Sequence, residues 1–131
     1  MFDQPVLLDL DVAVRFKPVS GEVDRAAGIA VRLANRDNYY VVRANALEDN
    51  VRLYKVVKGD RHQFAGADVK VPSGVWQELR LVVRRNRFEV LFEGRSLFSA
   101  VDTTFSTPGR VALWTKADSV TSFDDLRIGS L

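Results

Sequence analysis

The sequence predicts an all-β domain of about ten short antiparallel strands, packed as a two-layer sandwich or a barrel. Hydrophobic and polar residues alternate with period two through most of the chain, which places successive side chains on opposite faces of a strand. All four prolines stand between the alternating segments, where a missing N–H interrupts no strand pairing. Short turns join the segments and leave no room for crossover helices. The 131 residues are enough for a single domain, residues 1–131, with one core.

The first segment, from Leu8 to Phe16, places Leu10, Val12, Val14 and Phe16 on one face of a strand. Further strands are expected at residues 38–45, 51–58, 63–71, 79–84, 87–93, 96–101, 110–116 and 120–128. Glycine, proline and asparagine mark the turns between them, at residues 18–21, 58–60, 72–74, 85–86, 93–94 and 107–109.

Residues 22–36 fit two structures. Ala26, Ala30, Leu33 and Ala34 can line one side of a helix, and alanine favours helices. In the strand interpretation, Ile29, Val31 and Leu33 alternate with smaller or polar residues up to a turn at residues 35–38. We favour the strand.

Composition excludes several classes of site. The chain has no cysteine and one histidine, which excludes disulfides, thiolate nucleophiles, cysteine-rich zinc sites and histidine clusters. Nineteen Lys and Arg residues face 17 Asp and Glu residues, so the net charge of +2 does not indicate a nucleic-acid partner. The apolar runs are too short for a membrane helix, so no membrane insertion is expected. The abrupt opening at residues 1–5 suggests removal of a signal peptide or a leading strand.

Several segments, read in order, carry a family resemblance. They are Phe16–Gly21, Ala27–Arg32, Asn38–Asn45, Phe92–Gly94, Gly109–Thr115 and Phe123–Leu126. Their order resembles the concanavalin A-like lectin/glucanase superfamily, and within it the laminin-G-like domains and the bacterial 3-keto-disaccharide hydrolase family. The likeness covers residues 8–129.

The resemblance implies a jelly-roll sandwich with carbohydrate binding or cleavage on the concave face of one sheet, and a secreted or periplasmic location. It also implies a structural calcium ion near the two termini. Asp124 and Asp125, with Asp9 or Asp11, offer the oxygen ligands that calcium requires. Otherwise the composition indicates no cofactor.

The middle of the chain holds the strongest binding candidates, because arginine and asparagine hydrogen-bond to sugar hydroxyls and aromatic rings stack on pyranoses. The candidates are Arg32, Tyr39 (or Tyr40), Arg43, Asn45, Arg52, Tyr54, Trp114 and Lys116. In the alternative, Tyr39, Tyr54 and Trp114 are core aromatics and the arginines are their structural partners. Trp76, at the start of a strand, is expected in the core.

Three functions fit these residues. The first is a carbohydrate-binding module, with carbohydrate as its partner. The second is a glycoside-processing enzyme of the 3-keto type, in which the ketone acidifies a neighbouring C–H so that a single base starts elimination. The superfamily's glucanase carboxylate motif is absent, and the catalytic residues are unknown. The third is a structural or protein-interaction sandwich.

Arg32 and Arg43 give this interpretation a geometric test. If residues 27–34 and 38–45 form a hairpin around the turn at 35–38, Arg32 stands opposite Val41. Both guanidinium groups should then point to the same face, each with a ligand, a carbonyl or a carboxylate as partner.

Overall fold

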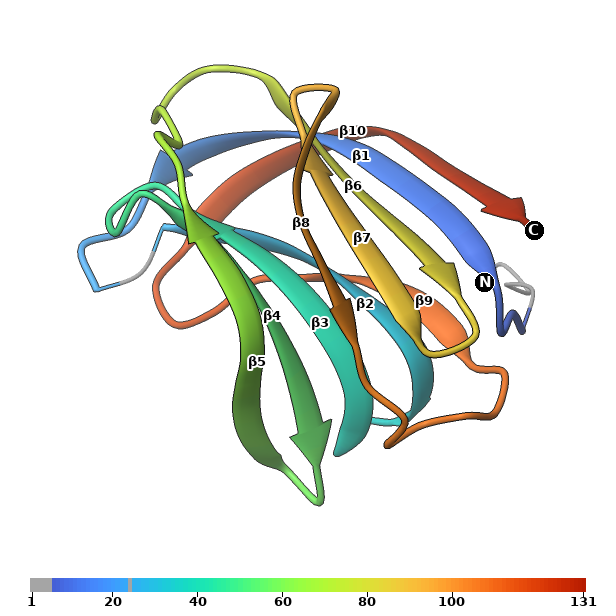
Figure 1. The fold of residues 1–131 in the computed structure, drawn as a ribbon. Helices are drawn as coiled ribbons and strands as arrows, with labels where there is room; N and C mark the ends of the chain where they lie inside the picture. Colours follow the sequence, from blue (N-terminus) through green and yellow to red (C-terminus); the bar gives the residue numbers. More distant parts are fainter. Residues whose placement is uncertain (1–5, 24) are drawn as a thin grey trace.

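The fold consists of ten antiparallel strands and, in the residues that the structure describes, no helix (Figure 1). The structure is a computed structural model that describes residues 6–23 and 25–131; residues 1–5, on which the expected abrupt opening rests, lie outside this range. The strands are β1 (Leu10–Ser20), β2 (Ala26–Asn35), β3 (Asn38–Asn45), β4 (Asn50–Val57), β5 (Asp60–Asp68), β6 (Gln77–Arg84), β7 (Arg87–Phe92), β8 (Arg95–Val101), β9 (Arg110–Trp114) and β10 (Val120–Ser130). In this described part, no helix is long and apolar enough to cross a bilayer.

The strands form two five-stranded sheets. One, called here the β1 sheet, has the order β10-β1-β6-β7-β8, and the other, the β3 sheet, has the order β5-β4-β3-β2-β9. Every strand pairing within them is antiparallel. The predicted all-β sandwich is therefore confirmed, and its jelly-roll form agrees with the structural comparisons reported below.

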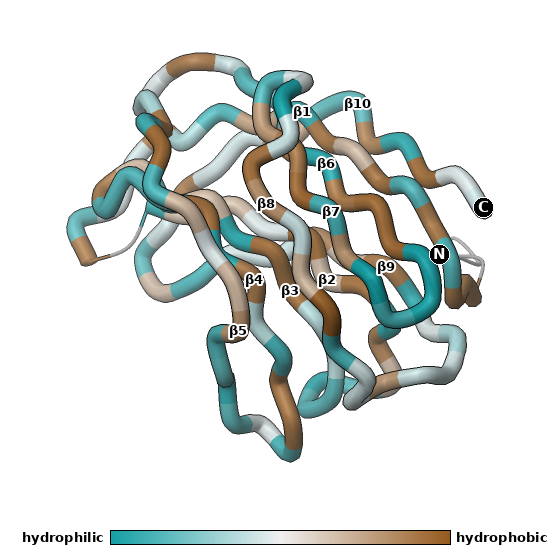
Figure 2. Tube along the Cα trace, in the orientation of Figure 1, coloured by the Kyte–Doolittle hydropathy of each residue, from teal (hydrophilic) through white to brown (hydrophobic). Residues whose placement is uncertain are grey.

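The core lies between the two sheets and takes alternate residues from each strand. Figure 2 shows the alternation of hydrophobic and hydrophilic residues along β6 and β7. The largest fully buried side chains come from both sheets and include Phe16, Ile29, Tyr40, Leu81 and Phe88. Because one face of each strand fills this core, the opposite face of each sheet remains for other roles.

The ambiguous segment at residues 22–36 contains β2, as the strand interpretation predicts. Ala27, Ile29 and Val31 enter the core, and Gly28 lies between them on the outer face. A Cβ atom at Gly28 would lie 2.8 Å from the Val42 carbonyl oxygen and 3.0 Å from Cε3 of Trp114. Gly28 thus provides space for an aromatic ring from β9.

Tyr40, the alternative to Tyr39 as a binding residue, points into the core. Its hydroxyl donates to Asp102 Oδ1 at 2.7 Å and accepts from the backbone N–H of Phe105 at 3.0 Å. Burial raises the pKa of Tyr40 to about 12. Tyr40 therefore holds the loop between β8 and β9 against the sheet rather than facing a ligand.

The expected pairing of β2 with β3 is correct at the turn and wrong beyond it. Asn35 pairs with Asn38, but Val31 pairs with Tyr40 and Ala30 with Val41, so β2 is irregular between Val31 and Asn35. Arg32 lies in this irregular stretch with φ of 49°. The sequence indicates the turn, but not the extra residues that change the register behind it.

The expectation that Arg32 and Arg43 share a face is consequently wrong. The Arg32 guanidinium, 1% exposed, donates to the carbonyl oxygens of Leu8, Phe105 and Arg85. It also lies over the ring of Phe88, 5.9 Å from the ring centroid. Arg32 thus joins three segments at one end of the sandwich, and the expectation that it would not be buried unpaired is confirmed.

We predict that Arg32→Met lowers the free energy of unfolding by about 3 kcal/mol, because it leaves three carbonyl groups without their charged donor. Urea denaturation followed by tryptophan fluorescence measures the change. Arg36→Met, at an exposed position in the β2–β3 turn, is the matched control and should alter stability by less than about 0.5 kcal/mol. Equal stabilities of the Arg32 and Arg36 variants would contradict the structural role of Arg32.

Candidate functional site

The outer face of the β3 sheet carries most of the predicted binding residues. A row of directly paired positions crosses it from Trp114 on β9 through Gly28, Arg43 and Arg52 to Gly66 on β5. Tyr39 and Val41 share this face of β3, since they alternate with the core residues of the strand. The face therefore combines aromatic rings, guanidinium groups and two glycines.

A small hydrophobic cluster lies at the centre of this face, separate from the main core. Val41, Tyr54 and Val56 are its buried members, and the half-buried rings of Tyr39 and Trp114 pack against them. Tyr39 and Trp114 are therefore each partly exposed, whereas Tyr54 is only 5% exposed.

One carboxylate lies between two opposed arginines beside this cluster. Arg43 and Arg52 occupy directly paired positions on β3 and β4, where like charges repel. Glu48, from the turn between these strands, places Oε2 3.0 Å from Nη2 of Arg43 and 3.9 Å from Nη1 of Arg52. Partial burial alone would raise the pKa of Glu48, but the hydrogen bond from Asn50 and the two guanidinium charges hold it below its ordinary value.

Tyr54 lies against several guanidinium groups. The guanidinium carbon of Arg43 is 5.3 Å from the ring centroid, and that of Arg61, on β5, is 4.7 Å from it. A hydrogen bond to Tyr54 also raises the pKa of Arg52. Because these guanidinium groups surround the ring of Tyr54, the ring packs against arginines and is not a free stacking surface for a sugar.

A shallow hollow of about 190 Å³ opens next to Arg52 on β4 and β5. It is lined by Asn50, Arg52, Gln63, Gly66, Ala67 and Asp68. A Cβ atom at Gly66 would lie 3.0 Å from Nε2 of Gln63 and 3.2 Å from Cγ of Arg52, so a side chain there would press on both. The groups around the hollow are mainly hydrogen-bonding amides and charges.

The structure brings five of the eight predicted residues to this face: Tyr39, Arg43, Arg52, Tyr54 and Trp114. Asn45 is fully buried, and its Oδ1 accepts the N–H groups of Leu47 and Glu48 in the β3–β4 turn. Arg32 lies at the end of the sandwich, as described above. Lys116 is half-buried in the loop that follows β9.

The sequence reasoning missed Glu48, Arg61 and Gln63. Glu48 lies outside any strand, so alternation could not place it, although its position between Arg43 and Arg52 in the sequence was an available signal. Arg61 falls between the expected turn at residues 58–60 and the expected strand at 63–71, whereas β5 begins at Asp60 and includes both Arg61 and Gln63.

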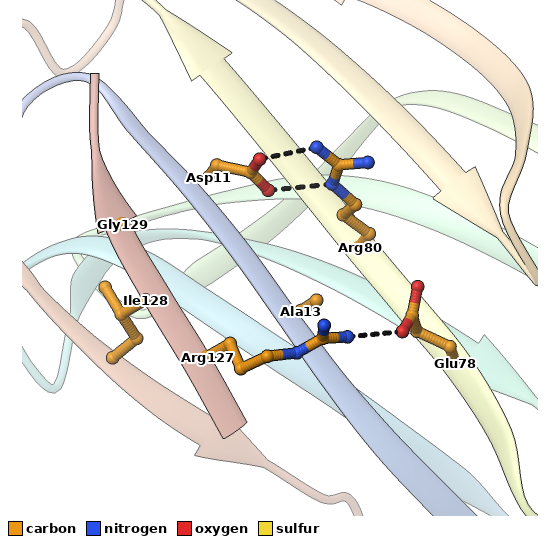
Figure 3. A pocket seen from close by; sticks show the side chains of 7 residues that line it. All are labelled: Asp11, Ala13, Glu78, Arg80, Arg127, Ile128 and Gly129. Carbon is orange, nitrogen blue, oxygen red and sulfur yellow. Dashed lines mark hydrogen bonds and ion pairs between the residues drawn. The ribbon is translucent and has the colours of Figure 1, made fainter. Parts of the chain in front are cut away.

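The outer face of the β1 sheet carries a larger hollow, of about 480 Å³, with Ala13 and Gly129 among its lining residues. Figure 3 shows two ion pairs around it. Arg80 binds the carboxylate of Asp11 through Nε at 2.8 Å and Nη2 at 2.5 Å, and Arg127 binds Glu78 at 2.6 Å. These charged groups already bind each other, and no aromatic residue is among those that line the hollow in the described part of the chain.

Trp76 lies on this same face, contrary to the expected core position. It is 37% exposed, and the cationic groups of Arg15 and Lys17 stand 5.8 and 5.4 Å from its ring. The tryptophan precedes the buried Gln77, so strand alternation turns it outward.

The expected calcium site is not supported by the side chains that the structure places. No group of three or more His, Cys, Asp or Glu residues is arranged to hold a metal within residues 6–23 and 25–131. Asp124 accepts the N–H of Asp125, Asp9 accepts the N–H of Arg85, and Asp11 binds Arg80. These carboxylates are engaged at separate places, so they do not fit a calcium ion.

Comparisons with known proteins show which fold the chain shares. No family model and no curated protein matches the sequence. The carbohydrate binding module CBM66 from Bacillus subtilis superposes with a TM-score of 0.85 at 21% identity, over 93% of this chain and 75% of that chain. The Caenorhabditis elegans galectin LEC-6 has a TM-score of 0.71 at 13% identity, over 97% of this chain and 86% of that chain. A variant of human galectin-16 has a TM-score of 0.73 at 16% identity, over 97% of this chain and 92% of that chain.

The ion pair between Asp11 and Arg80 should make the stability of the fold depend on pH in the acid range. The hydrogen bond from Arg80 lowers the pKa of Asp11, so the ionised form stabilises the fold above the ordinary pKa of the group. This stabilisation should disappear as the pH falls through the lowered pKa. Carbon-13 NMR titration should show Asp11 titrating below 3.8 in the natural chain and closer to that value in Arg80→Gln. The same pKa in both proteins would contradict the pairing.

Proposed function

We propose that this protein is a carbohydrate-binding module whose ligand site is the outer face of the β3 sheet. The observation that carries the proposal is the grouping of partly exposed aromatic rings with a guanidinium–carboxylate network on this one face. The sequence predicts a binding site on the concave face of one sheet. We assign that site to the outer face of the β3 sheet.

The two halves of the site suit the two kinds of surface on a sugar. Trp114 and Tyr39 offer partly exposed rings for the apolar face of a pyranose. Arg52, whose side chain is 38% exposed, offers N–H donors, and Glu48, 46% exposed, offers acceptor oxygens. Adjacent sugar hydroxyls can donate to such a carboxylate and accept from such a guanidinium at the same time.

Arg43 acts beneath this surface as a positioning residue. It is 2% exposed, and its bond to Glu48 fixes the carboxylate beside Arg52. The lowered pKa of Glu48 keeps that carboxylate ionised. An ionised carboxylate accepts hydrogen bonds from sugar hydroxyls and does not act as a proton donor.

The structural neighbours support this class of function. They include a carbohydrate binding module, galectins and an agglutinin from chicken liver. The likeness itself is one of fold, since identities are 21% or lower in these comparisons. The side chains of the β3 sheet therefore carry the functional argument.

We predict that Trp114→Ala and Arg52→Gln each weaken glycan binding by about tenfold, through loss of ring stacking and of a charge-assisted hydrogen bond. Glycan-microarray screening identifies the ligand, and isothermal titration calorimetry measures its affinity. Trp76→Ala and Arg87→Gln, which change the same residue types on the β1 sheet, are the matched controls and should bind like the natural chain.

Circular dichroism of each variant separates loss of binding from loss of fold. Arg52→Gln changes a partly exposed side chain and should leave the unfolding midpoint nearly unchanged. Folded variants of Trp114 and Arg52 that retain full affinity would overturn the proposed site. So would a loss of binding confined to the two control variants.

A further inference from the structure

Three arginines converge on one buried tyrosine at the β5 side of the proposed site. Arg43 and Arg61 contact the ring of Tyr54, with guanidinium carbons 5.3 and 4.7 Å from its centroid. Arg52 stands two residues before Tyr54 on the same face of β4. Guanidinium groups repel one another when they gather in this way, unless anions balance them.

The carboxylates of this face balance the arginines only in part. Glu48 bonds to Arg43 at 3.0 Å and approaches Arg52 no closer than 3.9 Å. Asp68 lines the hollow together with Arg52. Three guanidinium groups thus meet two carboxylates, and within the described residues Arg61 has Tyr54 as its partner and no ion pair.

The two outermost arginines remain accessible. The Arg52 side chain is 38% exposed, and Arg61 is exposed on β5. Arg43, in contrast, lies buried beneath them. Arg52 lines the hollow of about 190 Å³ together with Gln63 and Gly66. Arg61 stands on β5 two residues before Gln63, so both accessible arginines offer N–H donors on the β4–β5 side of the face.

We propose that the carbohydrate ligand is acidic and that its carboxylate or sulfate group binds at Arg52 and Arg61, with the rest of its sugar ring in the adjoining hollow. This inference rests on the proposed function and adds the charge of the ligand. The planar guanidinium group matches both anions, because each presents two oxygens to a pair of parallel N–H donors. Tyr54 holds Arg61 in place through its ring, so the donor is already positioned before the ligand arrives.

The experiment compares acidic glycans with neutral counterparts of the same linkage. Trigalacturonate is paired with its methyl ester, and a panel of uronate-containing and sulfated glycans on a microarray is paired with the corresponding neutral glycans. Calorimetry follows for each bound pair. The variants are Arg61→Gln and Arg52→Gln, and Arg87→Gln on the β1 sheet removes the same charge as the matched control.

Acidic glycans should bind about fivefold to tenfold more tightly than their neutral counterparts at low salt. Arg61→Gln and Arg52→Gln should each reduce this ratio toward one, and about 0.5 M NaCl should have the same effect on the natural chain. Arg87→Gln should preserve the ratio. The uronate and sulfate pairs show separately which anion the site accepts.

Each other outcome has a distinct meaning. Neutral glycans that bind as well as acidic ones would overturn this inference and leave the proposed function intact. A chain that binds no glycan would overturn both. An acidic preference that persists in Arg61→Gln and Arg52→Gln, or that falls equally in Arg87→Gln, would overturn the assignment to this pair of arginines.

Discussion

Two arginines stand directly opposite each other on neighbouring strands, and the site depends on the carboxylate that separates them. Arg43 on β3 faces Arg52 on β4, an arrangement that destabilises a sheet unless a counter-charge lies nearby. Glu48 supplies that charge from the turn joining the two strands. Asn45 holds the same turn by accepting two of its N–H groups. The register of the hairpin thus places the two arginines opposite each other, and the turn places the carboxylate that lies between them.

The remainder of the fold leaves this face free for a ligand. Inward residues of both sheets form the main core, and Arg32 and Tyr40 fasten the loops at one end through hydrogen bonds to backbone groups. Gly28 leaves room for Trp114 to lie on β2 beside the arginines. The β1 sheet differs in character, because its outer charges pair with one another, as Asp11 does with Arg80. This difference is why we propose the β3 sheet, rather than the β1 sheet, as the sugar-binding face.

Alternation within the sequence was sufficient to predict the sandwich, since most of the expected strands alternate with period two and the turns carry their typical residues. The same rule correctly grouped Arg43 with Tyr39, and Arg52 with Tyr54. It failed at Arg32, because the irregularity of β2 changes the register between Val31 and Asn35. It could not place Glu48, whose contacts come from a turn and not from a strand period. Nor could it show that the ring of Tyr54 is covered by guanidinium groups, which depends on long side chains from two other strands.

The central claim is that the ligand binds to the outer face of the β3 sheet, and amide chemical-shift mapping tests it most directly. The chain, labelled with nitrogen-15, is titrated with the glycan that it retains best on a microarray. We expect the largest shift changes on the β3 sheet, around Arg43, Arg52, Arg61 and Trp114. Shift changes centred on the β1 sheet around Arg80 and Trp76, or no saturable change with any glycan, would contradict it.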